Sequence, residues 1–417
     1  MIKKLFLALT FLATVVVSAQ EGTSSPYSFY GLGDVKFRGT HDVRSMGGLG
    51  IAYDSIHVNL LNPATYSRLK TTNFAVGGTS TFNDFSNEEK REQAQRTTID
   101  YLAVGFPLGT KFGATFGLMP FSSVGYKIQN QTSDSDTRSS KYNGEGGINR
   151  VFAGAAYNFS DYLSAGLNIE YNFGSIETET AIFIPDVILG SREKNNSIIK
   201  GISTNFALLY NRKITDKLEL STTLGFTPHS RLDSENTRKI ATISYNVNGT
   251  EFINDEDDSP VSNTKLTIPS KYTIGSGIGA SKKWFVGLEY TFQENSKLGN
   301  RFDDITNATF EDSQKIVLGG YFIPKYNSYT SYWSRVNYRA GFRYENTGLV
   351  INSKEINDYG INFGLGLPVG GRVSNINVGF EYGKKGTIYN NLIEENYFNL
   401  SIGLSLNDLW FEKRKYD

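Results

Sequence analysis

Residues 398–406 read Phe-Asn-Leu-Ser-Ile-Gly-Leu-Ser-Leu, an unbroken alternation of large apolar residues with small or polar ones. Successive residues of a β-strand point to opposite faces, so one face of this segment is apolar and the other is polar. The same pattern occurs at 163–173, 359–367 and 376–382. Segments of about ten residues are long enough for a tilted strand to cross a bilayer. The pattern therefore predicts long strands with one lipid-facing side.

The composition is compatible with such a fold and excludes several others. The 417 residues include 42 Lys+Arg, 42 Asp+Glu and no cysteine. A net charge of zero argues against a nucleic-acid partner, and the lack of cysteine excludes thiol catalysis and disulfides. Taken alone, the mean hydropathy of −0.33 indicates a water-soluble protein of two or three domains. In a membrane barrel, however, only every second strand residue contacts lipid.

The number of strands follows from the spacing of the alternating segments. We expect fourteen, at 72–82, 97–106, 111–128, 146–158, 162–174, 198–211, 216–227, 265–280, 283–293, 313–323, 333–345, 358–368, 374–383 and 396–406. Short and long connections alternate, as expected for periplasmic turns and outer loops, and the count is even. A further apolar stretch at 240–247 is assigned to an extracellular hairpin arm. A β-sandwich also gives alternation, but strand length, aromatic strand ends and a glycine-rich polar face favour an antiparallel transmembrane β-barrel.

The N-terminus indicates export from the cytoplasm. Residues 1–19 have a basic start, an apolar run and small residues before Gln20, which is typical of a secretory signal peptide. We therefore expect a signal peptide at 1–19, an N-terminal plug at 20–70, a barrel at 71–406 and a tail at 407–417. A barrel of fourteen strands has room for a plug. The alternative for 20–70 is a periplasmic tail.

The plug segment resembles a known family. Arg-Ser-Met-Gly-Gly-Leu-Gly-Ile-Ala-Tyr-Asp at 44–54, with Gly47, Gly48 and Gly50, is followed by Leu-Asn-Pro-Ala at 61–64. This order resembles the N-terminal hatch of the FadL-type outer-membrane transporters of hydrophobic compounds. Met-Pro-Phe-Ser at 119–122 and Gly-Glu-Gly-Gly-Ile-Asn at 144–149 are also similar to that family. The resemblance implies a fourteen-stranded barrel and a movable hatch, with Asn62, Pro63, Ala64 and the three glycines in gating.

One departure from that class of protein lies at the C-terminus. Many barrels end on an aromatic residue that the assembly machinery reads, whereas this chain continues for six residues after Trp410 and Phe411. The departure bears on the insertion signal and leaves the expected fold unchanged.

Pro120 interrupts the third expected strand. Proline cannot donate to a ladder and is confined to edges or bulges. In a closed barrel it predicts a local gap, and the family resemblance implies a lateral portal into the bilayer there. The alternative is a strand that ends at Met119.

Arg339 and Arg343 lie on the polar face of the expected strand 333–345. Arginine binds carboxylates through two parallel hydrogen bonds, so the pair could hold a ligand in the lumen. The alternative is a structural network with Glu170, Glu289 or Glu381.

Other candidate sites are weaker. Asn-Asp-Glu-Asp-Asp at 254–258 could bind Ca²⁺, but it matches no calcium loop and is interpreted as a solvated loop tip. Gly-Gly-Leu-Gly at 47–50 lacks the strand and helix of a dinucleotide site. His41, His57 and His229 have no catalytic spacing, so we expect no enzyme, no cofactor and no metal.

The leading hypothesis is a Gram-negative outer-membrane barrel for passive uptake of small hydrophobic, fatty-acid-like molecules. The hatch would gate it, and the ligand would leave sideways near Pro120. The alternative is a plugged FadL-like barrel that is a scaffold subunit of an outer-membrane secretion or assembly complex. The expected partners are outer-membrane lipid, a hydrophobic ligand and protein subunits, with no nucleic acid. A non-selective porin is disfavoured by the plug. An apolar tunnel near Asn62 and Arg339 would favour transport, and a filled lumen would favour a scaffold.

Overall fold

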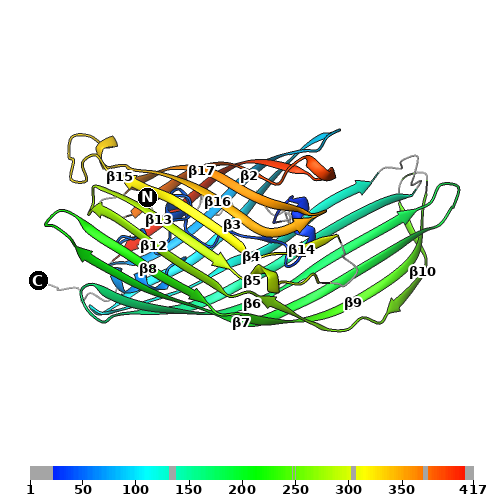
Figure 1. Ribbon diagram of the computed structural model, residues 1–417, viewed down its shortest axis with the longest axis horizontal. Helices are drawn as coiled ribbons and strands as arrows, with labels where there is room; N and C mark the ends of the chain where they lie inside the picture. Colours follow the sequence, from blue (N-terminus) through cyan, green and yellow to red (C-terminus); the bar gives the residue numbers. More distant parts are fainter. Residues whose placement is uncertain are drawn as a thin grey trace, which may run out of the picture.

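The protein is a closed antiparallel β-barrel with an N-terminal segment folded inside it (Figure 1). The computed structural model describes residues 22–130, 138–246, 248, 250–301, 307–369 and 374–408. The expected signal peptide, and Trp410 and Phe411 of the tail, lie outside these residues. No helix in the described part of the chain has the length and apolar character needed to span a membrane.

Fourteen strands form the wall, as the sequence predicts. Twelve of these positions are single strands: β2 (Thr72–Ser86), β3 (Arg91–Leu108), β4 (Phe112–Asn130), β5 (Ser139–Asn158), β6 (Leu163–Phe183), β7 (Gly190–Lys213), β13 (Trp284–Gln293), β15 (Ser313–Phe322), β16 (Asn337–Ile351), β17 (Lys354–Val369), β18 (Ser374–Lys385) and β19 (Glu394–Asp408). Two are interrupted and carry two labels each: β8 (Glu219–Thr227) with β9 (Ser230–Tyr245), and β11 (Thr264–Ile268) with β12 (Lys271–Ala280). Pairing of β19 with β2 closes the barrel.

Several strands are longer than the sequence predicts. β7 has 24 residues and β6 has 21, and both belong to a sheet that extends the wall toward the right end of the molecule in Figure 1. β9 joins this sheet and forms a hairpin with β10 (Glu251–Ser259), which agrees with the expected hairpin arm. The acidic stretch 254–258 belongs to β10, so its interpretation as a loop tip was wrong. Cross-strand pairing holds these charged residues in the sheet.

The start of strand β16 also differs from its prediction. Trp333–Arg335 form the short 3-10 helix η4, and the strand begins at Asn337. The side chains of Trp333 and Arg335 therefore belong to a connection, and the lumen face of β16 begins only after them.

The outward face of the wall is apolar and carries a row of aromatic side chains near one end. On β13 the exposed side chains Val286, Leu288 and Tyr290 alternate with Phe285 and Glu289, which are buried inside. Trp284 lies opposite Phe322, which lies opposite Tyr338, and together they form a row near one end of the barrel. This row marks one edge of the lipid-facing band, as expected for an interfacial girdle.

The lumen holds the hatch, defined here as residues 22–70. Its elements are the 3-10 helix η1 (Pro26–Phe29), the strand β1 (Asp34–Val35), the one-turn helix α2 (His41–Arg44) and the 3-10 helix η2 (Pro63–Arg68). The hatch supplies the fully buried side chains Leu49, Ile51, Leu60 and Tyr66. The remaining short elements are η3 (Asn295–Lys297), β14 (Ala308–Phe310) and η5 (Tyr389–Asn391), all in the long connections between wall strands.

Glycines of the wall let the hatch backbone come close. A Cβ added at Gly319 would lie 2.2 Å from the carbonyl oxygen of Met46, and one added at Gly341 would lie 2.2 Å from its carbonyl carbon. Such distances are far below van der Waals contact, so only glycine fits there. Facing strands β15 and β16 thus provide a smooth seat for the hatch.

We predict that Gly341→Ala unseats the hatch without unfolding the barrel. Overpacking costs about 1–3 kcal/mol, which raises the population of the unseated hatch by roughly fivefold to 150-fold. Limited trypsin digestion of the folded protein checks this, because Arg38 and Arg44 become cleavable. Gly299→Ala is the control, since a Cβ there meets nothing within 4 Å. Equal protection of both variants would show that the close contact is unimportant.

Candidate functional site

The Asn-Pro-Ala motif fixes one end of the hatch to the wall. Asn62 accepts a hydrogen bond from the Ala64 backbone N–H at 3.1 Å, and so caps η2. Its side-chain amide donates to Thr223 Oγ1 of β8 at 3.0 Å. A Cβ at Gly166 of β6 would lie 2.3 Å from the Pro63 carbonyl carbon. The motif is therefore buried against the inner face of the wall.

The glycine stretch makes the turn that follows α2. Gly47 and Gly48 have φ of 74° and 91°, a left-handed conformation that favours glycine. A Cβ at Gly47 would also lie 3.0 Å from the Phe342 carbonyl oxygen of β16. Gly50 has no such φ, but it lies beside Glu289, whose Oε2 is 3.3 Å from an added Cβ. These glycines bring hatch and wall together, and their expected role in gating stays a prediction.

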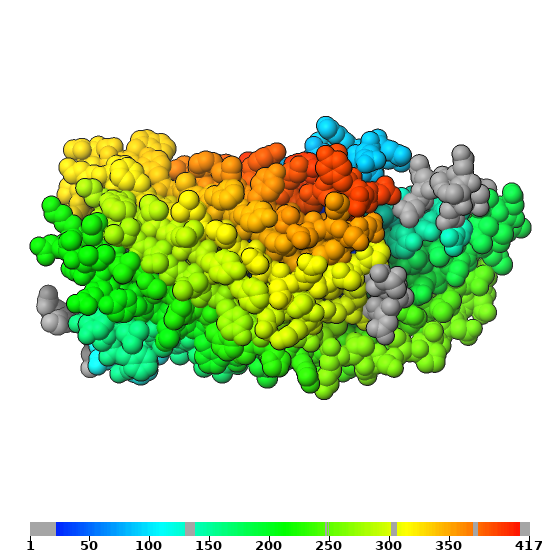
Figure 2. All heavy atoms as spheres, in the orientation of Figure 1, coloured from blue at the N-terminus to red at the C-terminus, as the bar shows by residue number. Residues whose placement is uncertain are grey.

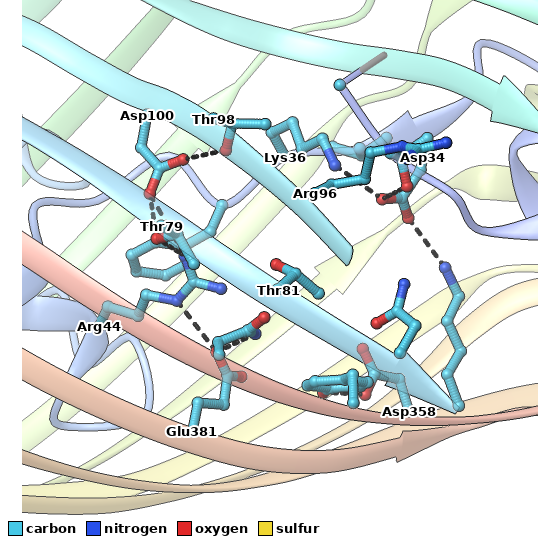
Figure 3. A pocket seen from close by; sticks show the side chains of 18 of the residues that line it. Asp34, Lys36, Arg44, Thr79, Thr81, Arg96, Thr98, Asp100, Asp358 and Glu381 are labelled. Atoms are coloured by element: carbon cyan, nitrogen blue, oxygen red, sulfur yellow. Dashed lines mark hydrogen bonds and ion pairs between the residues drawn. The ribbon is translucent and has the colours of Figure 1, made fainter. Parts of the chain in front are cut away.

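The first ionic contact between hatch and wall is centred on Arg44 (Figure 3). Its Nε lies 3.0 Å from Glu381 Oε2 of β18, and its Nη1 lies 3.5 Å from Asp100 Oδ2 of β3. Arg343 of β16 reaches Glu381 at 3.0 Å and Asp358 of β17 at 3.1 Å. One hatch arginine is thereby joined to a network that crosses four strands.

Two further ionic contacts lie at other points of the hatch. Arg38 Nη2 lies 2.5 Å from Glu170 Oε1 of β6, and Glu170 also pairs with Arg150 of β5 at 3.2 Å. Asp34 pairs with Lys385 of β18 at 2.9 Å and with Lys36 at 3.1 Å. Burial alone would raise the pKa of Asp34, but the two lysine charges hold it well below its usual range.

The two arginines singled out from the sequence belong to this structural framework. Arg343 pairs with Glu381, one of the three expected partners, and Arg339 donates to Asn377 at 2.8 Å. The exposed fraction of Arg339 is only 5%. Both side chains thus contact wall residues, as in the structural-network alternative, and a role in ligand binding stays a prediction. The sequence analysis did not name the partners Asp358 and Asn377. Their places on the polar face of their strands could have indicated them.

The hatch histidines have structural surroundings. His41 is buried against Tyr101, and its Nε2 lies 3.5 Å from Asp100 Oδ2. Burial lowers the pKa of His41 to about 4, so the ring is neutral at pH 7. His57 Nδ1 lies 2.6 Å from Asp54 Oδ2. No group of three or more potential metal-ligating side chains occurs within the described ranges.

A polar cavity of about 150 Å³ lies between the hatch and the wall. Charged and hydroxyl side chains line it, among them those labelled in Figure 3. Around Asn62 and Arg339, where a transporter should have an apolar tunnel, both side chains are buried and hydrogen-bonded.

Pro120 lies within β4, which continues beyond Met119 to Asn130. The pairing of β4 with β5 shifts by one residue between Pro120 and Ser122, a β-bulge. The pairing of β3 with β4 ends at Leu102 and Leu118. The two residues of β1 pair with Ser122 and Ser123 instead, so the hatch completes the wall beside the bulge. Val35 of β1 is 62% exposed there.

These features define a plugged outer-membrane-type barrel, and comparisons with solved structures agree. The Pseudomonas putida toluene transporter TodX has a TM-score of 0.59 at 15% identity, with 90% of this chain and 98% of that chain covered. The Ralstonia pickettii toluene transporter TbuX has a TM-score of 0.55 at 14% identity, with 89% of this chain and 99% of that chain covered. A Pseudomonas aeruginosa FadL homologue has a TM-score of 0.56 at 11% identity, with 88% of this chain and 97% of that chain covered. At these identities the likeness shows the fold alone.

The sequence family is a different one. The BamG family model matches residues 1–417, so the chain belongs to the BamG family. No curated protein matches the sequence. The resemblance to FadL-type transporters therefore holds for the fold, and BamG is the family.

We predict that Arg44→Met destabilises the folded protein by about 2–4 kcal/mol, because it leaves buried carboxylates without one of their cations. Lys384→Met is the matched control: the Lys384 side chain pairs with Glu394 and is 33% exposed, against 16% for Arg44. Its loss costs about 0–1 kcal/mol. Urea unfolding in detergent or lipid measures both. The double variant Arg44→Met/Glu381→Gln should lose less than the sum of the two single changes. Full additivity would contradict a direct interaction.

Proposed function

We propose that the chain is a structural subunit of a Gram-negative outer-membrane complex, a barrel whose lumen the hatch keeps closed. The BamG family match supports this proposal, because it is consistent with a subunit of an outer-membrane complex. The observation that carries it is the lining around Asn62 and Arg339, which is filled by buried, hydrogen-bonded side chains. A scaffold needs a stable outer wall and no open path through the lumen.

The cost of moving the hatch supports the same proposal. Release would separate Arg44 from Glu381, Arg38 from Glu170 and Asp34 from Lys385. Leaving one charge of a buried pair without its partner costs about 3–5 kcal/mol. Water entering the lumen would offset part of this, but three such contacts together still favour the seated hatch. The ordinary state of this barrel is thus a closed one.

Passage of small hydrophobic molecules is the second candidate. It is favoured by the bulge at Pro120, the early end of β3–β4 pairing and the fold shared with toluene transporters. In this mechanism the ligand enters from the outer loops, the hatch shifts, and the ligand leaves sideways into the bilayer past Val35. Asn62, Gly47, Gly48 and Gly50 would then act in gating, and Arg339 and Arg343 would face the ligand.

Native purification separates the two candidates. The full chain, tagged and extracted in mild detergent, is expected to retain other outer-membrane proteins in fixed ratio through size-exclusion chromatography. An isolated barrel that carries lipid or detergent in its lumen would contradict the scaffold proposal.

Uptake measurements on Pro120→Val give the second test. If the bulge is a portal, restoring regular pairing abolishes uptake of a labelled hydrocarbon or fatty acid by cells. The scaffold proposal expects equal uptake in the variant, the wild type and the deletion strain. A Val35→Leu variant is the control, because it changes an exposed side chain at the same gap without altering the β4 backbone.

A further inference from the structure

One end of the barrel carries a strong excess of positive charge. This is the end with the short connections, which in such barrels faces the periplasm. Among the residues that the structure describes, nine exposed cations lie there against three exposed anions: Lys70, Lys111, Arg212, Lys213, Lys217, Lys282, Lys283, Lys325 and Arg335 against Asp161, Asp216 and Asp408. The whole chain has no net charge. The excess is therefore a local feature of this end.

The longest connection at this end is rich in exposed aromatic residues. Between Ile323 and Val336, Tyr329 is 100% exposed, Trp333 63%, and Tyr326 and Tyr332 39% each. This loop protrudes at the upper left of the molecule in Figure 2, in gold. It lies beyond the aromatic row of Trp284, Phe322 and Tyr338, so its tip projects past the edge of the lipid-facing band.

The loop is already ordered. Lys325 N–H donates to Ser334 O at 2.8 Å, and Arg335 N–H donates to Tyr332 O at 2.9 Å. Buried Ser328 accepts from the Ser331 N–H, and Tyr332 Oη donates to Pro368 O of β17. A preorganised loop loses little conformational entropy on binding. Exposed Tyr and Trp on such a loop have the composition of interface hot spots.

The loop and its neighbouring turns form one surface. Lys282 lies 4.8 Å from the Tyr326 ring centroid, and Ile323 N–H donates to Lys283 O at 2.7 Å. Beside them is a groove of about 610 Å³ between the turns 213–219 and 280–284. Lys213, Lys217, Lys283 and Trp284 line it, and the carboxylates Asp216 and Glu219 lie among the three lysines. We call this surface, comprising the loop 323–336 and the groove, the periplasmic patch.

We propose that the periplasmic patch binds an acidic segment of a periplasmic protein, with Tyr329 and Trp333 as apolar anchors and the lysines of the groove pairing with its carboxylates. The inference rests on the proposed function and names one face through which the scaffold would hold a partner. A positive surface steers a negative partner and selects against basic ones. The phospholipid surface is the competing occupant, and the position of Tyr329 beyond the aromatic row favours the protein.

Site-specific photocrosslinking in cells tests the proposal. A benzoylphenylalanine replaces Tyr329 in the full chain, and the control replaces Tyr389, which is 66% exposed in the outer connection that contains η5. We expect a discrete protein adduct from position 329, with the crosslink in an acidic stretch of the partner. Lys213→Glu/Lys283→Glu in the same chain should lower the adduct yield at least tenfold, and Lys384→Glu should leave it unchanged. Heat-dependent gel migration checks that each variant folds.

The outcomes distinguish this inference from the proposed function. Lipid adducts alone, or a protein adduct whose yield is unaffected by charge reversal, would overturn the inference. If other subunits still co-purify in that case, the scaffold function stands and another face holds the partner. If nothing co-purifies and neither position gives an adduct, both proposals fail.

Discussion

The contact between hatch and wall is the constraint on which the rest of the structure depends. A fourteen-stranded barrel encloses more space than its own side chains fill. Here the hatch fills it, and charged groups on the hatch meet opposite charges on the wall: Arg44 with Glu381, Arg38 with Glu170, and Asp34 with Lys385. Charged side chains lower the mean hydropathy of the chain. Some of them form ion pairs inside the barrel, between the hatch and the wall.

The close seat of the hatch explains much of the glycine in the wall. Gly166, Gly319 and Gly341 each leave space that hatch backbone occupies. A larger side chain at these positions would push the hatch toward the lumen axis and stretch the ion pairs. The glycines let the hatch come close enough for the ion pairs to form, and the ion pairs in turn hold the hatch against the glycines.

The sequence was sufficient for the fold because period-two alternation is a local signal. Fourteen strands, the short connections and the hairpin arm could all be read from it. The pairing between residues that are distant in the sequence could not be read from this local signal. The sequence offered three glutamates as partners for Arg343, and only the barrel register brings Glu381 and Asp358 to it. The acidic stretch of β10 was misinterpreted because its strand is stabilised by pairing with β9 and lacks apolar alternation.

The central claim is that the hatch stays seated while the protein functions, and a reversible cross-link tests it most directly. A Cβ at Gly379 of β18 would lie 2.8 Å from Ser45 Oγ of the hatch, and the chain has no cysteine of its own. Ser45→Cys/Gly379→Cys, with Ser401→Ala to make room, can therefore lock hatch to wall. Hydrocarbon uptake and co-purification of other subunits are measured before and after oxidation. The account predicts that both are unchanged by the disulfide. Uptake that stops on oxidation and returns on reduction would contradict it.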